Sequence, residues 1–188
     1  MTRTAAALVG VLASAASALA VIIGSHSGAA ATFTTVNGCI SNNIMVHTNT
    51  LLVRLHHRGE GAIESDITIQ SRDTCSGLDL GTSSGNGDPA RVAFTVDLNG
   101  ASLTGAILVV DGNGTLRSVP VSLAWTGVGT IKRANTTTRV VTGDVTTTVH
   151  TRNASRNATV TGSVDGLPVD SADGMLFKDA TVTQSRTK

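Results

Sequence analysis

Apolar residues that recur at every second position constrain this fold more than any other sequence feature. From 92 to 98 the apolar positions are Val, Phe, Val and Leu, and from 119 to 125 they are Val, Val, Leu and Trp. Successive side chains of a β-strand point to opposite faces, so each segment should bury one face only. An apolar run at 103–110 lies between them, after Asn99-Gly100 and before Asp111-Gly112-Asn113-Gly114. These features predict a three-stranded antiparallel meander, with Asn99-Gly100 in a type I′ turn and a hairpin turn at 111–114.

Similar but weaker patterns extend over most of the remaining chain. The further expected strands are 51–55, 63–69, 139–141, 145–149, 158–164 and 180–183. Outside the N-terminal leader no segment has helical periodicity, and β-branched Thr and Val dominate. The sequence therefore predicts an all-β fold, a single antiparallel β-sandwich of about eight to ten strands, with a β-barrel as the alternative. Pro120 predicts a sheet edge or a bulge, because it has no N–H to donate, and Thr82–Pro89 predicts a long surface loop.

The first residues have the pattern of an export signal. Arg3 precedes an uncharged, Ala-rich run that extends from Ala5 to Ile23. Small residues suit signal cleavage after Ala20 or after Ala31, and polar 24–28 followed by strand-like sequence favours Ala31. We therefore predict a signal peptide at 1–31 and a single all-β domain at 32–188, secreted or on the cell surface. An uncleaved anchor is the alternative; after cleavage no membrane span is expected.

The chain contains only two cysteines, Cys39 and Cys75. In an oxidising compartment an even number of cysteines predicts pairing, so we expect a Cys39–Cys75 disulfide. A metal site is the alternative, but it needs further ligands, and neither cysteine belongs to a CxxC motif. We expect no metal and no cofactor.

Composition narrows the classes of partner. Aromatic residues make up 2% of the chain and Tyr is absent, which argues against aromatic platforms for sugars or single-stranded nucleic acids. Charged residues make up 14% with a net charge of +1, so neutral Thr, Ser, Asn and Gly must provide much of the solubility. The chain is Thr-rich, and its preference for Arg over Lys together with much Ala, Gly and Val suggests a bacterium with a GC-rich genome. Sequons at Asn113, Asn135, Asn153 and Asn157 would matter only in a eukaryotic host.

Charge is distributed unevenly along the chain. Between 131 and 156 five basic residues occur with only one acidic residue, Asp144. The predicted anion-binding face consists of Lys132, Arg133, Arg139, Arg152 and Arg156. Such a face would attract anionic polymers, with an affinity that falls as salt rises. A solvated sheet face is the alternative, and the lack of aromatic residues in this segment predicts no specific nucleic-acid recognition.

Catalytic signatures are weak. His56-His57 is the first place to look for a metal or a general base, but adjacent strand residues point to opposite faces. His47 and His150 could join a site only through the fold, and His26 falls in the predicted signal. No G-x-S-x-G motif is present, and the two Glu residues, Glu60 and Glu64, do not form a convincing catalytic pair. Asp111–Gly114 lacks the other ligands of a calcium loop.

Three hypotheses for the function follow. The first is an exported, non-catalytic β-sandwich with a surface-binding or structural role, whose partner is an anionic cell-surface polymer or another protein. The second is a secreted inhibitor or interaction module that presents an edge strand. The third is a secreted hydrolase whose site is assembled from scattered His and Asp residues. The positions of His47, His56, His57 and His150 relative to one another would separate the third hypothesis from the others.

Overall fold

The computed structural model describes residues 19–55 and 58–187, and these form eight long β-strands. The strands are β1 (Leu19–Asn37), β2 (Ile40–Leu55), β3 (Arg58–Asp73), β4 (Asp79–Val96), β5 (Gly100–Val110), β6 (Leu116–Thr142), β7 (Val145–Val164) and β8 (Leu167–Thr187). The all-β prediction is confirmed. The described residues contain no helix long and apolar enough to cross a membrane.

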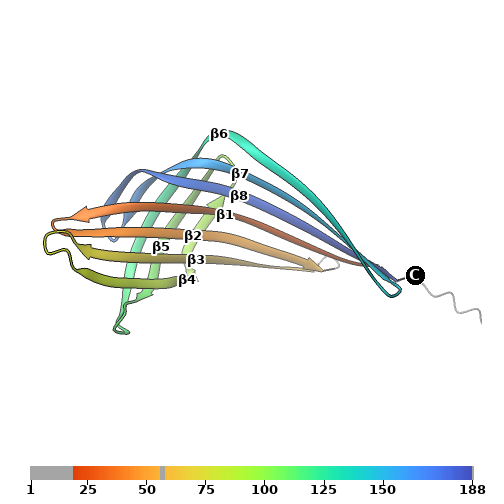
Figure 1. Ribbon diagram of the computed structural model, residues 1–188, viewed down its shortest axis with the longest axis horizontal. Helices are drawn as coiled ribbons and strands as arrows, with labels where there is room; N and C mark the ends of the chain where they lie inside the picture. Colours follow the sequence, from red (N-terminus) through yellow and green to blue (C-terminus); the bar gives the residue numbers. More distant parts are fainter. Residues whose placement is uncertain (1–18, 56–57, 188) are drawn as a thin grey trace, which may run out of the picture.

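Each strand pairs antiparallel with the next, and β1 also pairs with β8, so the sheet closes into a barrel (Figure 1). The strand pairing thus follows the predicted alternative, the barrel, rather than two separate sheets of a sandwich. The antiparallel connectivity follows from short turns between consecutive strands, because a tight turn can join only antiparallel neighbours.

Alternation places the core inside the closed part of the barrel. Along β6, Val119, Val121, Leu123 and Trp125 are all buried while the residues between them are exposed. The indole N–H of Trp125 donates to the Ala30 carbonyl oxygen at 3.0 Å, which ties β6 to β1 across the interior. Phe94 of β4 is buried and Val96 packs against the core. The predicted inward faces of these two segments are therefore confirmed where the structure describes their side chains.

Several strands continue well beyond the closed part. β6, β7, β8 and β1 extend to the C-terminal end, β2 and β3 extend less far, and β4 and β5 stop short of both (Figure 1). Along this extension β6 from Lys132 to Thr142 pairs with β7 alone. The extension is therefore an open, curved sheet that continues the barrel wall, and its two faces continue the inner and outer faces of the barrel.

Three local predictions need correction. Segment 82–86 belongs to β4 and pairs with β3, so the predicted surface loop at Thr82–Pro89 is wrong; backbone hydrogen bonds to a neighbouring strand order a segment that has little apolar surface of its own. The expected strands 145–149 and 158–164 are likewise one strand, because the residues between them, including 151–156, belong to β7. The type I′ turn at Asn99-Gly100 is also wrong, because neither residue has a positive φ. The Asp97 carboxylate instead accepts the N–H groups of Asn99 and Gly100, at 2.6 and 2.9 Å.

Other turn predictions are confirmed. The Asp111 carboxylate accepts the N–H groups of Asn113 and Thr115, which makes 111–114 a hairpin turn between β5 and β6. Pro120 pairs with Ala106 of β5, and the pairing of β6 with β7 begins only at Val121. Its missing N–H therefore falls where β6 is locally an edge, as the sequence predicts.

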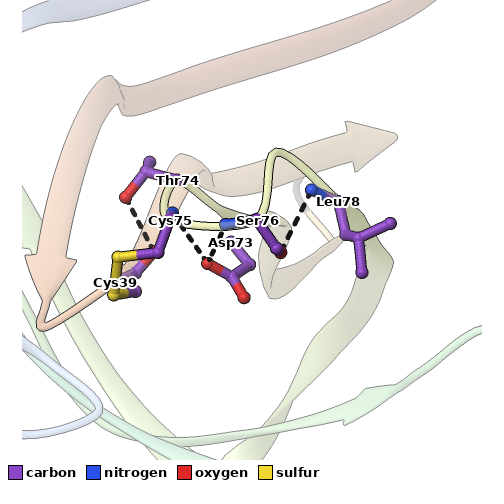
Figure 2. Close-up of a disulfide and its surroundings, with 6 residues drawn as sticks. All are labelled: Cys39, Asp73, Thr74, Cys75, Ser76 and Leu78. Atoms are coloured by element: carbon purple, nitrogen blue, oxygen red, sulfur yellow. Dashed lines mark hydrogen bonds between the residues drawn. A yellow bond between two sulfur atoms is a disulfide. The ribbon is translucent and has the colours of Figure 1, made fainter.

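The predicted disulfide is confirmed. Cys39 and Cys75 are bonded, with 5.4 Å between their Cα atoms, and they join the β1–β2 turn to the β3–β4 turn (Figure 2). Asp73 lies beside the bridge, and hydrogen bonds from Ser76 and from the Cys75 N–H lower the pKa of its carboxyl group. Both sulfur atoms are used by the disulfide, so the grouping of Cys39, Asp73 and Cys75 offers no thiolate to a metal.

Candidate anion-binding face

Strand register decides on which face each basic residue of the extension lies. Arg156 of β7 pairs with Leu176 of β8, which pairs with Ala29 of β1, and both of these are core residues with 0% exposure. Residues directly opposite each other across antiparallel strands share a face. Arg156, and every second residue of β7 from it toward the β6–β7 turn, therefore lies on the continuation of the inner face.

Most of the predicted basic residues meet on this inner face. Arg152 is two positions from Ala154, which pairs with Arg133 of β6 and with Lys178 of β8. Arg139 pairs with Thr148, and Arg186 pairs with Thr146. We call this set the basic strip; it comprises Arg133, Arg139, Arg152, Arg156, Lys178 and Arg186. Only Arg156 is partly buried, and the other members are exposed.

Lys132 is the exception among the five predicted residues. It pairs with Ser155, which has the opposite parity to Arg156, and so it lies on the outer face. Lys178 and Arg186 of β8 join the strip instead of Lys132. Sequence reasoning missed them because they lie on the next strand, outside the basic segment 131–156. Arg152 and Lys178 are diagonal neighbours on adjacent strands, with about 7–8 Å between their Cα atoms.

Within the described part of the extension no carboxylate of β6, β7 or β8 shares the inner face with the strip, although Asp179 of the opposite face lines a hollow of about 160 Å³ together with Arg133. The residues of β6, β7 and β8 that share the inner face with the strip are neutral apart from its own members and His150. The described ion pairs, His26–Asp179, His47–Asp66 and Arg117–Asp165, include no member of the strip. The charged residues on the inner face of β6, β7 and β8 in the extension are therefore all basic.

One carboxylate borders the strip where the barrel begins. Asp97 and Lys178 line a hollow of about 180 Å³ together with Ser27. The N–H groups of Asn99 and Gly100 lower the pKa of Asp97, so this carboxylate stays ionised at neutral pH. An anion is therefore expected to bind farther out, nearer to Arg152 and Arg139, where no such repulsion operates.

Arg156 has a structural task in addition to its charge. Its guanidinium donates to the Gly129 carbonyl oxygen at 3.0 Å, the Asn99 Oδ1 at 2.9 Å and the Leu98 carbonyl oxygen at 3.3 Å. These bonds join β7 to the β4–β5 loop and to the irregular segment of β6. All three acceptors are uncharged, so these hydrogen bonds bring no opposite charge to Arg156 at the junction of barrel and extension.

His150 and Arg152 mark the most hollowed part of the strip. A cavity of about 370 Å³ is lined by these two residues together with Ala180 and Val182 of β8. The Nδ1 atom of His150 lies 3.0 Å from the Thr137 hydroxyl, which fixes the ring against β6. β8 thus contributes apolar side chains to the lining of the cavity, and β7 contributes His150 and Arg152.

The histidines of the hydrolase hypothesis do not gather where the structure describes them. His150 is on the inner face, whereas His47 is on the outer face, stacked on Phe177 with ring centroids 5.6 Å apart. His26, which sequence reasoning placed in the signal, lies in β1 on the other side of the same Phe177 ring at 5.4 Å. His56 and His57 lie outside the described residues. Among the described histidines only His150 has a hydroxyl within hydrogen-bond distance, and that hydroxyl belongs to a threonine.

A second hollow lies near the disulfide end. Its volume is about 410 Å³, and it is lined by Ser41, Asn43, Gln70, Ser71, Arg72, Gly77 and Asp79. Arg72 and Asp79 bring opposite charges to it, so it lacks the single sign of charge that characterises the strip.

Comparisons with protein-family models, with curated proteins and with solved structures found no match.

Proposed function

We propose that this protein is exported and binds an extended anionic polymer through the basic strip, without catalysing a reaction. The observation that carries the proposal is that all charged residues on the inner face of β6, β7 and β8 in the extension are basic. Lys178 and Arg186 are eight positions apart on β8, which corresponds to about 27 Å of extended strand. Cations spread over that length suit a polymer with repeated negative charges better than a small anion.

Export is supported by two features. The N-terminal sequence has a basic residue followed by an apolar, Ala-rich run. The Cys39–Cys75 disulfide points to an oxidising compartment, because cytosolic thiols are kept reduced. A secreted or cell-surface location brings the strip into contact with the phosphate- and carboxylate-bearing polymers of the cell exterior.

The ligand class follows from what the strip carries. Arg and Lys recognise phosphate and carboxylate oxygens, and no described aromatic side chain lies on the strip to stack on a base or a sugar. Recognition therefore depends on charge density, and nucleotide sequence is not read.

Binding to long-chain inorganic polyphosphate tests the proposal, with uncharged dextran as the negative control. An Arg133→Ala, Arg139→Ala, Arg152→Ala triple variant should bind roughly tenfold more weakly at low salt, since exposed ion pairs each contribute about 0.2–1 kcal/mol. Wild-type affinity should fall steeply between low and high NaCl.

The matched control removes the same charge from elsewhere. A Lys132→Ala, Arg72→Ala, Arg117→Ala triple variant should keep most of the affinity, because Lys132 is on the outer face and the other two residues belong to the barrel. Equal losses in the two triple variants would mean that net charge alone drives binding. An unchanged affinity in the strip variant would remove the proposal.

A second candidate function, an interaction module, is supported by the open edge of the extension. From Lys132 to Thr142, β6 pairs with β7 on one side only, and an unpaired strand edge can accept a strand from a partner. Arg133 and Arg139 on this edge would favour an acidic partner strand. Pull-down with extended acidic peptides, repeated after introducing Thr136→Pro, separates edge pairing from binding by side-chain charge.

A further inference from the structure

The N-terminal half of β1 is an integral part of the fold. β1 begins at Leu19, pairs with β8 from Leu19 to Thr32 and pairs with β2 from Ile22 to Asn37. It is therefore the strand that closes the ring of eight. Residues up to 31 cannot be removed without changing what β8 and β2 pair with.

The residues around Ala31 are also enclosed by the core. Ala29 is 0% exposed and Ala31 is 3% exposed. The carbonyl oxygen of Ala30, between them, accepts the indole N–H of Trp125 at 3.0 Å. Gly28 lies against the Phe177 ring, with no room for a side chain of its own. Close packing explains these small residues, inside the barrel for Ala29 and Ala31 and against Phe177 on the outer face for Gly28, so they need no explanation as a cleavage signal.

Signal cleavage after Ala20 and signal cleavage after Ala31 would have very different structural consequences. Cleavage after Ala31 would leave a single register pair between β1 and β8, Thr32 with Asp173, and would open the barrel. It would also remove the β1 residue that pairs with Lys178, a member of the basic strip. Cleavage after Ala20 removes only the pairs of Leu19 with Arg186 and Ala20 with Ser185, and it leaves the pairing with β2 intact.

We propose that the exported protein is processed between Ala20 and Val21, at Ala18-Leu19-Ala20, so that the mature chain begins with almost all of β1. The inference rests on the proposed export. The residues before this position include the basic Arg3 and the apolar, Ala-rich run, and Ala18 and Ala20 are the small residues that a cleavage site needs. The consequence of cleavage there is that His26 and the small residues at 28–31 belong to the mature protein.

Mass spectrometry and N-terminal sequencing of the exported protein test the assignment. The full chain is expressed in a bacterial host, and its exported and cytoplasmic fractions are purified separately. Val21 as the first residue supports the proposal. Thr32 as the first residue overturns it while leaving export intact, and so does an exported chain that still begins with Met1. Full-length chain found only in the cytoplasm overturns the proposed export together with the processing.

Two variants sharpen the test by altering each cleavage motif separately. Ala20→Leu replaces the small residue at the proposed position and should leave the uncleaved precursor as the dominant species. Ala31→Val makes the same kind of change at the other position and should be cleaved to Val21 like the wild type. Because Ala31 is a core residue, processing in that variant is read from the mass of the total exported material, folded or unfolded. Normal processing of Ala20→Leu together with blocked processing of Ala31→Val would reverse the assignment.

Discussion

At the scale of single residues, small side chains decide how closely the strands approach. Gly28 is opposite Phe177 in the β1–β8 register, and the Phe177 ring lies across it between the rings of His26 and His47. A Cβ atom at position 28 would lie 2.7 Å both from Phe177 Cε2 and from the Thr48 carbonyl oxygen. The backbone oxygen cannot move away as a flexible side chain could, so this glycine is a packing requirement.

We therefore predict that Gly28→Ala lowers the free energy of unfolding by about 1–3 kcal/mol, the usual cost of overpacking. Gly24→Ala is the matched control in the same strand, because a Cβ there meets nothing within 4 Å. It should be neutral or stabilise by up to about 1 kcal/mol through the unfolded chain. Urea unfolding followed by Trp125 emission measures both variants. Equal stabilities of the two variants would contradict this account of Gly28.

At the scale of strands, register determines which charges share a face. The turn at Gly143-Asp144 between β6 and β7 sets the pairing of Arg133 with Ala154, so the common face of Arg133, Arg139, Arg152 and Arg156 could have been predicted from the sequence. The position of Lys178 could not. A register shift between Val160 and Gly162 gives β8 one extra residue, and it places Lys178, rather than Asp179, on the inner face beside Arg152. The alternation of apolar and polar residues along β7 and β8 does not predict this bulge.

Gly162 of β7 lies at this bulge. Its φ is +134°, and a Cβ there would collide with the Ser122 carbonyl oxygen of β6. We predict that Gly162→Ala destabilises the fold by about 1–3 kcal/mol, because the backbone conformation is strained for any residue with a side chain. The measurement is urea unfolding, with the Gly24→Ala variant as reference. If Gly162→Ala is as stable as the wild type, the bulge does not depend on this conformation.

At the scale of the whole molecule, the disulfide and the β6–β7 turn lie at opposite ends of the long axis (Figure 1). The sequence predicted the disulfide, the strand-rich class and the turn at 111–114, because each depends on local chemistry. It did not establish the ring closure by β1 and β8, because that contact joins opposite ends of the described chain. The basic strip was predicted in part for the same reason, since two of its members belong to β8.

The separation of the two ends predicts independent behaviour. Replacing both Cys39 and Cys75 with Ala should lower the free energy of unfolding by about 3–4 kcal/mol, since the bridge closes a loop of 36 residues in the unfolded chain. Under conditions where the variant remains folded, polyphosphate binding should be unchanged. A reductant should lower the stability of the wild type to that of the variant and leave the variant unaffected. Weaker polyphosphate binding by the folded double variant would show that the two ends are coupled.

Ring closure by the first and last strands also determines the order in which an exported chain can fold. Such a chain crosses its membrane from the N-terminus onward, so β1 emerges first and must wait for β8, with nearly the whole polypeptide between them. Cys39 and Cys75 both emerge early, and their bond can hold the turns of β1–β4 together meanwhile. Contacts between such distant segments form slowly. In an exported chain this topology would delay completion of the barrel until β8 has crossed the membrane, so the chain would stay unfolded enough to be translocated.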